Sequence, residues 1–201
     1  MGYTHYFGMK KKSAMNKQKW ASIIEDTKRL LVRLPKDSMS AGGCHAGVPI
    51  ELALEYDLPD KRPALNSEVI TFNGVGEMGH ETFCLEREKE NDGFDFCKTH
   101  RKPYDLVVCA VLIVVHTHAP GWRNINSDGD LQDWVPALHW VREVLGEHYQ
   151  MPLEDPEGAL DLLLEDFAFD EAKAASSSRF NDPLLSRIYN LGKGESLTEW
   201  F

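Results

Sequence analysis

The sequence predicts an α+β fold in which a mostly antiparallel sheet is covered by helices on one face. Short stretches of alternating polar and apolar residues indicate strands, and longer stretches with apolar residues at helical spacing indicate helices. The expected order is strand, helix, strand, strand, helix, strand, helix. Its first six elements match the ferredoxin-like order. This match is topological and implies no function.

The first strand is expected over residues 2–7, because its side chains alternate with the period of an extended chain. The side chains of Tyr3, His5 and Phe7 then share one face. A helix is expected at about 16–34, where apolar residues recur at helical spacing until a proline ends the pattern.

Residues 37–67 contain several glycines and prolines, which predicts a long loop. Two strands are expected after it, at 68–73 and 81–88. Because a glycine-rich connection joins them, we expect a hairpin with a connection longer than the tight two-residue type.

The segment from Pro103 to Ala119 predicts a helix buried on nearly every side. It contains ten consecutive apolar residues, from Leu106 to Val115, and many of them are β-branched as in strands. The segment has no turn signal, however, and a proline suits the first turn of a helix. A strand at 122–126 and a helix capped by Asp130 complete the expected elements.

Residues 1–150 are expected to form the core domain, and residues 151–201 a separate acidic appendage. The formal net charge of −10 argues against binding to duplex nucleic acid, which requires a basic surface. The longest apolar run is too short to span a bilayer. The lack of an apolar leader and of paired cysteine spacings predicts a cytoplasmic protein with reduced thiols.

The sequence contains no established zinc or calcium motif. His116 and His118 point in different directions on the predicted helix, so they cannot share one ion. The acidic residues that follow the last strand resemble the start of a calcium loop, but Val135 stands where the loop needs a glutamate. Asp128 and Asp130 remain candidate ligands for Mg²⁺.

Three side chains are candidates for acid–base catalysis. His80 and Glu81 are adjacent and follow a glycine-rich turn, and His5 lies on the first strand between Thr4 and Tyr6. Thr4 and Tyr6 would add polar groups that contact a ligand. The alternative for each histidine is a structural hydrogen bond to the backbone.

Residues 94–105 (FDFCKTHRKPYD) concentrate positive charge in front of the buried helix. A helix N-terminus presents unpaired N–H groups and the positive end of the helix dipole, and cations such as Lys98 and Arg101 add to this field. We therefore expect a phosphate or carboxylate site here, with Thr99 as an additional donor and Tyr104 as an aromatic face for a base or sugar. The alternative is that the cations pair with neighbouring acidic residues.

Four motifs occur in order along about residues 1–145. They are MGYTHYF, ITFNG followed by GHETFCL, FCKTHRKPYDLVV, and NINSDGDLQDW. These motifs resemble a family of small, uncharacterised proteins of bacteriophages and prophages. The resemblance implies a place in the cytoplasm of an infected or lysogenic bacterium, but no activity. It adds Asn73, Ser127 and Asp128 to the candidate ligand-binding residues, because they match the family motifs.

Three functions follow as hypotheses. The first is a protein that binds a small anionic, nucleotide-like ligand, for example to sequester a host signalling nucleotide in counter-defence. The second is a hydrolase or transferase that acts on such a ligand through His80, Glu81 and His5. The third is an acidic inhibitor that binds a host protein through residues 154–171 and the C-terminal Trp200-Phe201. The sequence leaves the oligomeric state open.

Overall fold

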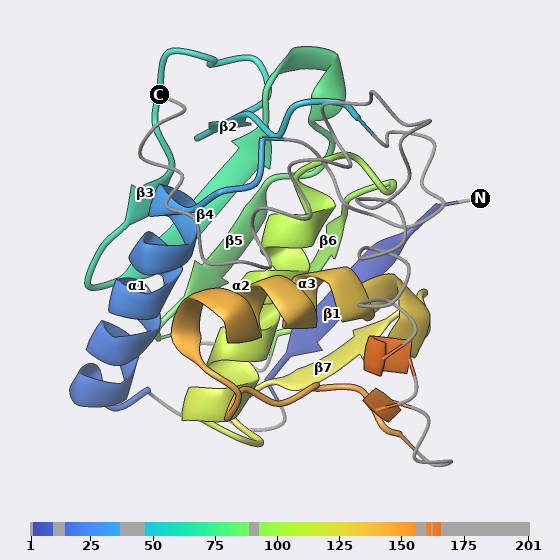
Figure 1. Ribbon diagram of the computed structural model, residues 1–201. Coiled ribbons are helices and arrows are strands. Elements are labelled where there is room, and N and C mark those ends of the chain that lie inside the picture. Colours follow the sequence, from blue (N-terminus) through green and yellow to red (C-terminus); the bar gives the residue numbers. More distant parts are fainter. Residues whose placement is uncertain are drawn as a thin grey trace, which may run out of the picture. The chain divides into compact units, whose positions relative to one another are not determined.

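The computed structural model describes residues 2–9, 15–36, 47–88, 93–155, 160–161 and 163–165. The chain divides into two units, Met1–Glu154 and Asp155–Phe201. The first unit holds every element labelled in Figure 1, and the helical residues described in the second are 160, 161 and 163–165. Most of the acidic segment and the C-terminal Trp200-Phe201, which the inhibitor hypothesis needs, lie outside the described residues.

The first unit has two antiparallel sheets. The first has the strand order β6-β1-β7, with the bounds β1 Thr4–Gly8, β6 Phe96–Lys98 and β7 Asn124–Ser127. In the second, β4 pairs with three strands, and the bounds are β2 Leu52–Ala53, β3 Ala64–Leu65, β4 Val69–Gly74 and β5 Phe83–Glu86. Because β5 contacts β6, the two sheets adjoin along these strands.

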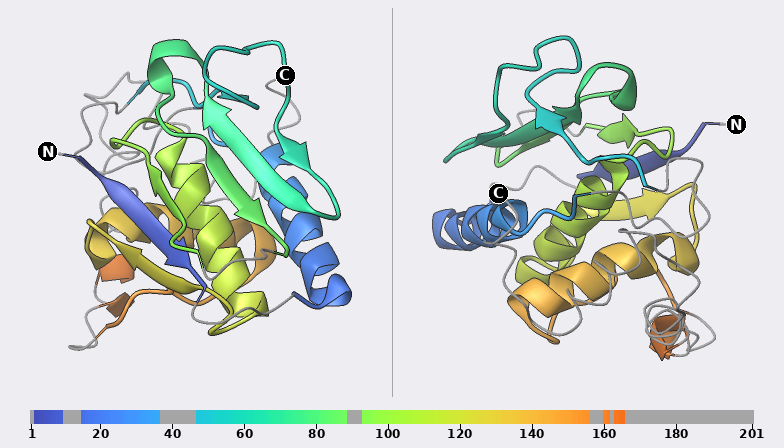
Figure 2. Two further views of the ribbon diagram at one scale, coloured as in Figure 1. Left: turned by 180° about the vertical axis from the view of Figure 1, so that it is seen from behind. Right: turned by 45° about the horizontal axis from the view of Figure 1, so that its top comes forward.

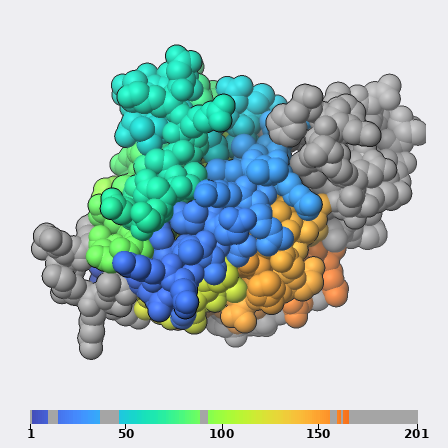
Figure 3. Space-filling model, turned by 90° about the vertical axis from the view of Figure 1, so that its left-hand side faces the viewer, coloured from blue at the N-terminus to red at the C-terminus, as the bar shows by residue number. Residues whose placement is uncertain are grey.

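The helices gather on one side of the strands, as both views in Figure 2 show. Their bounds are α1 Lys17–Val32, α2 Asp105–His118 and α3 Leu131–Leu145. A short 3₁₀ helix, η1 Gly76–Met78, lies in the connection between β4 and β5. Within the helical layer, α2 packs against both α1 and α3, and the outer side of α1 is seen in blue in Figure 3. The predicted α+β class is therefore confirmed.

Helix α2 is the centre of the core. All ten residues from Leu106 to Val115 are buried, which confirms the predicted buried helix despite its many β-branched residues. The helix starts at Asp105, two residues after the expected proline. In the described part of the chain, no helix is long and apolar enough to cross a membrane.

The strands depart from the expected ferredoxin-like order, because among the described residues five strands and not two lie between α1 and α2, and the strands form two sheets and not one. Strand β1 pairs with β7 on one side and with the three-residue β6 on the other side. The predicted β4–β5 hairpin forms. The sequence analysis missed β6, and it also missed β2 and β3, which lie in the predicted loop. Strands β2 and β3 have two residues each and are too short to show an alternating pattern.

Strand β7 and helix α3 meet at Asp128–Asp130. Strand β7 ends at Ser127, one residue beyond the expected end. The Asp130 side chain accepts a hydrogen bond from the backbone N–H of Asp133, and the Asp133 side chain accepts one from the backbone N–H of Asp130. This capping box confirms the predicted helix start.

Candidate functional site

His5 is the centre of a polar cluster below β1. The ladders of β1 place His5 opposite Cys97 and Ser127, so these three side chains share the face that is turned to the helices. The His5 imidazole has no exposed surface. It lies edge-on to the rings of Tyr3 and Trp134, with each pair of ring centroids 5.1 Å apart. An imidazole enclosed in this way needs polar partners within the protein.

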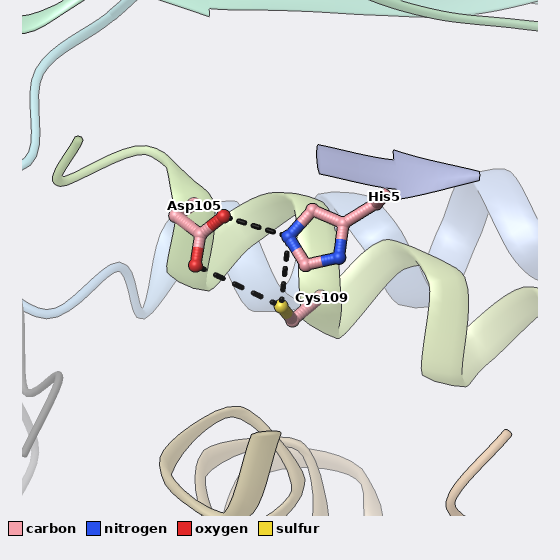
Figure 4. A group of neighbouring side chains, drawn as sticks. All are labelled: His5, Asp105 and Cys109. Carbon is pink, nitrogen blue, oxygen red and sulfur yellow. Dashed lines mark hydrogen bonds and ion pairs between the residues drawn. The ribbon is translucent and has the colours of Figure 1, made fainter. Parts of the chain in front are cut away.

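Both nitrogens of the His5 ring have such partners. Nε2 lies 2.7 Å from Oδ1 of Asp105 and 3.6 Å from Sγ of Cys109, as Figure 4 shows. Asp105 and Cys109 are four residues apart on α2 and therefore project from the same side of the helix. On the other side of the ring, Nδ1 lies 3.1 Å from Oγ of Ser127.

Asp105 and Ser127, the partners of His5, are themselves held by hydrogen bonds. The hydroxyl of Thr99 donates a hydrogen bond to Oδ1 of Asp105. The backbone N–H of Gly129 donates to Oγ of Ser127 at 3.0 Å. A Cβ at Gly129 would lie 2.6 Å from Oδ2 of Asp133 and would also overlap Tyr3, so only glycine fits here.

The cluster has the parts of two kinds of chemical site. A serine hydroxyl, an imidazole and a carboxylate in sequence are the parts of a nucleophile activated by a base. His5, Asp105 and Cys109 each offer a metal-ligating atom, and these atoms lie within 4.8 Å of one another. Burial, followed by the negative charge of Asp105, raises the pKa of the Cys109 thiol well above its ordinary value. Cys109 alone is therefore not an activated nucleophile.

The opposite face of the same sheet carries exposed aromatic side chains. The rings of Tyr6 and Phe94 have centroids 5.5 Å apart, and those of Phe94 and Phe96 5.6 Å apart. Phe94 is 71% exposed and Phe96 48% exposed. We call Tyr6, Phe94 and Phe96 the aromatic platform. Beside it lies an open hollow of about 730 Å³, lined by Tyr6, Gly8, Met9, Gly93, Phe94, Asn124, Asn126 and Ser127.

Polar groups border the aromatic platform. Lys98 follows Phe96 by two residues and pairs with Thr4, so its side chain is on the same face as Tyr6. Among the described residues, Lys98 forms no ion pair. The hydroxyl of Tyr6 donates to Oδ1 of Asp128 at 3.1 Å.

The turn before α2 differs from the anion site that its charges led us to expect. The N–H of Asp105 donates to the carbonyl of Lys102, and two further N–H groups of the first turn donate to the carbonyl of Tyr104. The carboxylate of Asp105 already lies at this helix end. The guanidinium of Arg101 pairs with Asp133. This agrees with the alternative that the cations form ion pairs, but the acidic partner comes from α3 and not from a neighbouring residue. Three amides that we expected to be free, those of Asp105, Val107 and Val108, are thus bonded within the chain.

Thr99 and Tyr104 are fully buried. The hydroxyl of Thr99 is engaged by Asp105, and that of Tyr104 donates to the carbonyl of Glu81 at 2.7 Å. Neither side chain presents a surface to a ligand. Their role in the structure is to join the turn, β6 and the start of α2.

His80, Glu81 and Asn73 belong to a separate network. The side chain of Asn73 bonds to the backbone of His80 on both its donor and acceptor sides. Oε2 of Glu81 accepts the N–H of Lys98 at 2.7 Å. The exposed His80 ring lies beside His100, at 5.5 Å between centroids. In the described part of the chain, no hydrogen bond or ring contact joins His80 or Glu81 to His5.

Three other residues considered as metal ligands, Asp128, Asp130 and His118, form hydrogen bonds within the protein. Asp128 accepts from Tyr6 and Asp130 caps α3, so both carboxylates have protein donors. His118 lies 2.7 Å from Asp26 on α1.

No protein-family model, curated protein or solved structure matches the chain. The phage-family resemblance therefore stays a prediction.

Several residues of these sites were not among the sequence candidates, Asp105 among them. Cys109 lies within a long apolar run and was indistinguishable from a core residue, although its spacing of four from Asp105 was visible. Trp134 is an apolar residue of the helix predicted after Asp130, and its sequence context gives no signal of a site. Phe94 and Phe96 alternate as in a strand, and this was the signal that could have revealed β6 and the aromatic platform.

Proposed function

We propose that the protein binds a small anionic, nucleotide-like ligand on the open face of the sheet β6-β1-β7. The observation that carries the proposal is the exposed aromatic platform next to Lys98, a cation with no acidic partner in the described residues. Aromatic side chains on the open face of a small antiparallel sheet stack bases in single-stranded nucleic-acid binding. Because the net charge is −10, a short ligand fits better than a polymer.

This face offers one group for each part of a nucleotide: the aromatic platform for the base, Asp128 for the ribose and Lys98 for the phosphate. The backbone positions of Phe96 and Lys98 are about 7 Å apart along one strand, a span that one nucleotide can bridge. The ammonium of Lys98 lies beside Gly2. A base stacked on the aromatic platform would place its phosphate near Lys98. The carboxylate of Asp128, which is held by Tyr6, is an acceptor for ribose hydroxyls.

The edges of the base also have partners. Asn124 and Asn126 are exposed on β7, line the hollow and lie on the same face as Tyr6. Each side-chain amide offers a donor and an acceptor, which is what the edge of a base requires. This set of groups supports a preference for nucleotides over phosphate or nucleosides alone.

A second candidate function is turnover of the same ligand by a hydrolase or transferase. It is favoured by the contacts Ser127–His5–Asp105, in which the imidazole can accept the serine proton while the carboxylate orients the ring. Ser127 also lines the hollow, although its Oγ is directed to His5 on the helix-facing side of the sheet. Under this alternative, Ser127 is the nucleophile, and His80 and Glu81 take no direct part.

Isothermal titration calorimetry with a panel of linear and cyclic nucleotides, nucleosides and inorganic phosphate tests the proposal. We expect at least one nucleotide to bind more tightly than its nucleoside or phosphate. Phe96→Ala and Phe94→Ala should each weaken binding by about 5- to 150-fold, since stacking contributes about 1–3 kcal/mol per base. Lys98→Ala should weaken binding and reduce its salt dependence.

The matched control is Tyr56→Ala, which removes an aromatic side chain that is 52% exposed and lies outside the platform. Binding should survive this change. Absence of heat with every nucleotide, or an equal loss in Tyr56→Ala and Phe96→Ala, rejects the proposal. Ligand recovered intact after denaturation of the protein indicates binding alone, and converted ligand indicates the enzyme.

A further inference from the structure

The helix-facing side of β1 carries a cluster of possible metal ligands, whose role does not depend on nucleotide binding. Figure 4 shows three donor atoms that point toward one another from two elements: Nε2 of His5 on β1, and a carboxylate oxygen of Asp105 and Sγ of Cys109 on α2. They are an imidazole nitrogen, a carboxylate oxygen and a sulfur. This is the donor set that zinc prefers in proteins.

We propose that His5, Asp105 and Cys109 bind one divalent transition-metal ion of the zinc class. Zinc bonds of about 2.0–2.3 Å in tetrahedral geometry place neighbouring ligand atoms about 3.3–3.6 Å apart. The separation between Nε2 of His5 and Sγ of Cys109 is 3.6 Å, and that between Sγ and Oδ2 of Asp105 is 4.0 Å. The Nε2–Oδ1 separation of 2.7 Å is that of a hydrogen bond, and a small rotation of the carboxylate opens it to the required distance.

The charges of the three ligands balance such an ion. A carboxylate and a thiolate supply two negative charges, and the imidazole is neutral, so a dication gives a buried site without net charge. Burial of an uncompensated charge is costly, and a neutral metal centre avoids this cost. The side chain of Asp105 is 14% exposed, whereas that of His5 is fully buried. The carboxylate therefore provides the entry path.

The surrounding groups are those that orient metal ligands. With Nε2 on the ion, Nδ1–H donates to Oγ of Ser127, and this bond fixes the ring and its tautomer. Thr99 donates to the ligating carboxylate. Second-shell bonds of this kind are typical of protein metal sites.

One buried polar atom beside His5 points to a further guest. Nε1 of Trp134 forms no hydrogen bond in the described part of the chain, and its ring contacts the His5 ring. A buried polar atom without a partner is rare in native proteins. A water on the open fourth position of the ion is a partner for this atom, as catalytic zinc sites keep one such position.

Titration of the metal-depleted protein with Co²⁺, followed by absorption spectroscopy, tests the inference. Co²⁺ replaces zinc and gives a thiolate-to-metal charge-transfer band only when a cysteine is a ligand. We expect this band to saturate at one ion per chain in the wild type and in Cys97→Ala. Cys97 is also fully buried but lies outside the cluster. The band should be absent in Cys109→Ala and weakened at least tenfold in apparent affinity in Asp105→Asn.

The shift of the melting temperature Tm on addition of Zn²⁺ provides a second test that does not depend on the cobalt absorption band. At a hundredfold excess of Zn²⁺ over its dissociation constant, the wild-type Tm should rise by about 5–10 °C, and that of Cys109→Ala by much less. Circular dichroism shows that each variant is folded. A missing charge-transfer band in folded wild-type protein overturns the inference. A band that persists in Cys109→Ala, or one that disappears in Cys97→Ala, also overturns it.

Discussion

The carboxylate of Asp26 joins α1 to α2 and to the segment after α3, so its removal should destabilise the core. Its Oδ2 accepts a hydrogen bond from the Tyr149 hydroxyl at 2.6 Å and lies 2.7 Å from Nε2 of His118. Oδ1 accepts one from Arg29 at 3.2 Å, and the residue is only 8% exposed. Hydrogen bonds to a charged group contribute about 1.5–3 kcal/mol each. Asp26→Ala removes a buried bond to Tyr149 and a part-buried one to His118, and should therefore lower the free energy of unfolding by about 3–5 kcal/mol.

This loss should depend on pH. Burial by itself raises the pKa of Asp26, but the hydrogen bonds from Tyr149 and His118, together with nearby positive charge, outweigh burial and lower it. A carboxyl group with a lowered pKa in the folded state stabilises the protein above its unfolded pKa of about 3.9. That contribution disappears as pH falls through the folded pKa. The difference between wild type and Asp26→Ala should thus be full at pH 7 and shrink below about pH 4.

Urea denaturation followed by circular dichroism measures both effects. The control is Glu25→Ala, which removes an exposed carboxylate from the same helix and should change stability by no more than about 0.5 kcal/mol. A cost below about 1 kcal/mol for Asp26→Ala at pH 7, or an equal cost for the two variants, would refute the reasoning.

Two further substitutions test the packing around the candidate sites. Gly129→Ala places a methyl group against Tyr3 and Asp133 and should destabilise the protein by about 1–3 kcal/mol in thermal unfolding; an unchanged Tm would contradict the close contact. Arg123 is 3% exposed and pairs with Asp95 at 2.7 Å, so Arg123→Ala should cost about 3–5 kcal/mol in urea denaturation. A cost near zero would show that this ion pair does not stabilise the fold.

The long elements were predictable because their local pattern and their tertiary environment agree. The buried helix α2 follows from ten consecutive apolar residues between a proline and a Pro-Gly stop. The start of α3 follows from Asp130 and Asp133, whose side chains form the capping box by themselves. In both cases the information lies within a few neighbouring residues.

The candidate sites were only partly predictable, because they depend on pairing between distant segments. His5 was identified as a candidate, but its partners come from residues about 100 and 122 positions away. The positive charge at 98–102 was visible, whereas the pairing of Arg101 with Asp133 depends on the position of α3. Strand β6 has three residues and forms only because β1 supplies its hydrogen bonds. Without β6, the aromatic platform was not recognisable.

The most direct test of the proposed function is to map the ligand on the protein by NMR. Amide ¹H–¹⁵N spectra recorded during titration with the best nucleotide from calorimetry locate the contacts by residue. The account predicts saturable shifts concentrated on β1, β6 and β7, with the largest at Tyr6, Phe96 and Lys98. Shifts confined to the turn before α2 or to the β4–β5 connection, with β1, β6 and β7 unchanged, would contradict it.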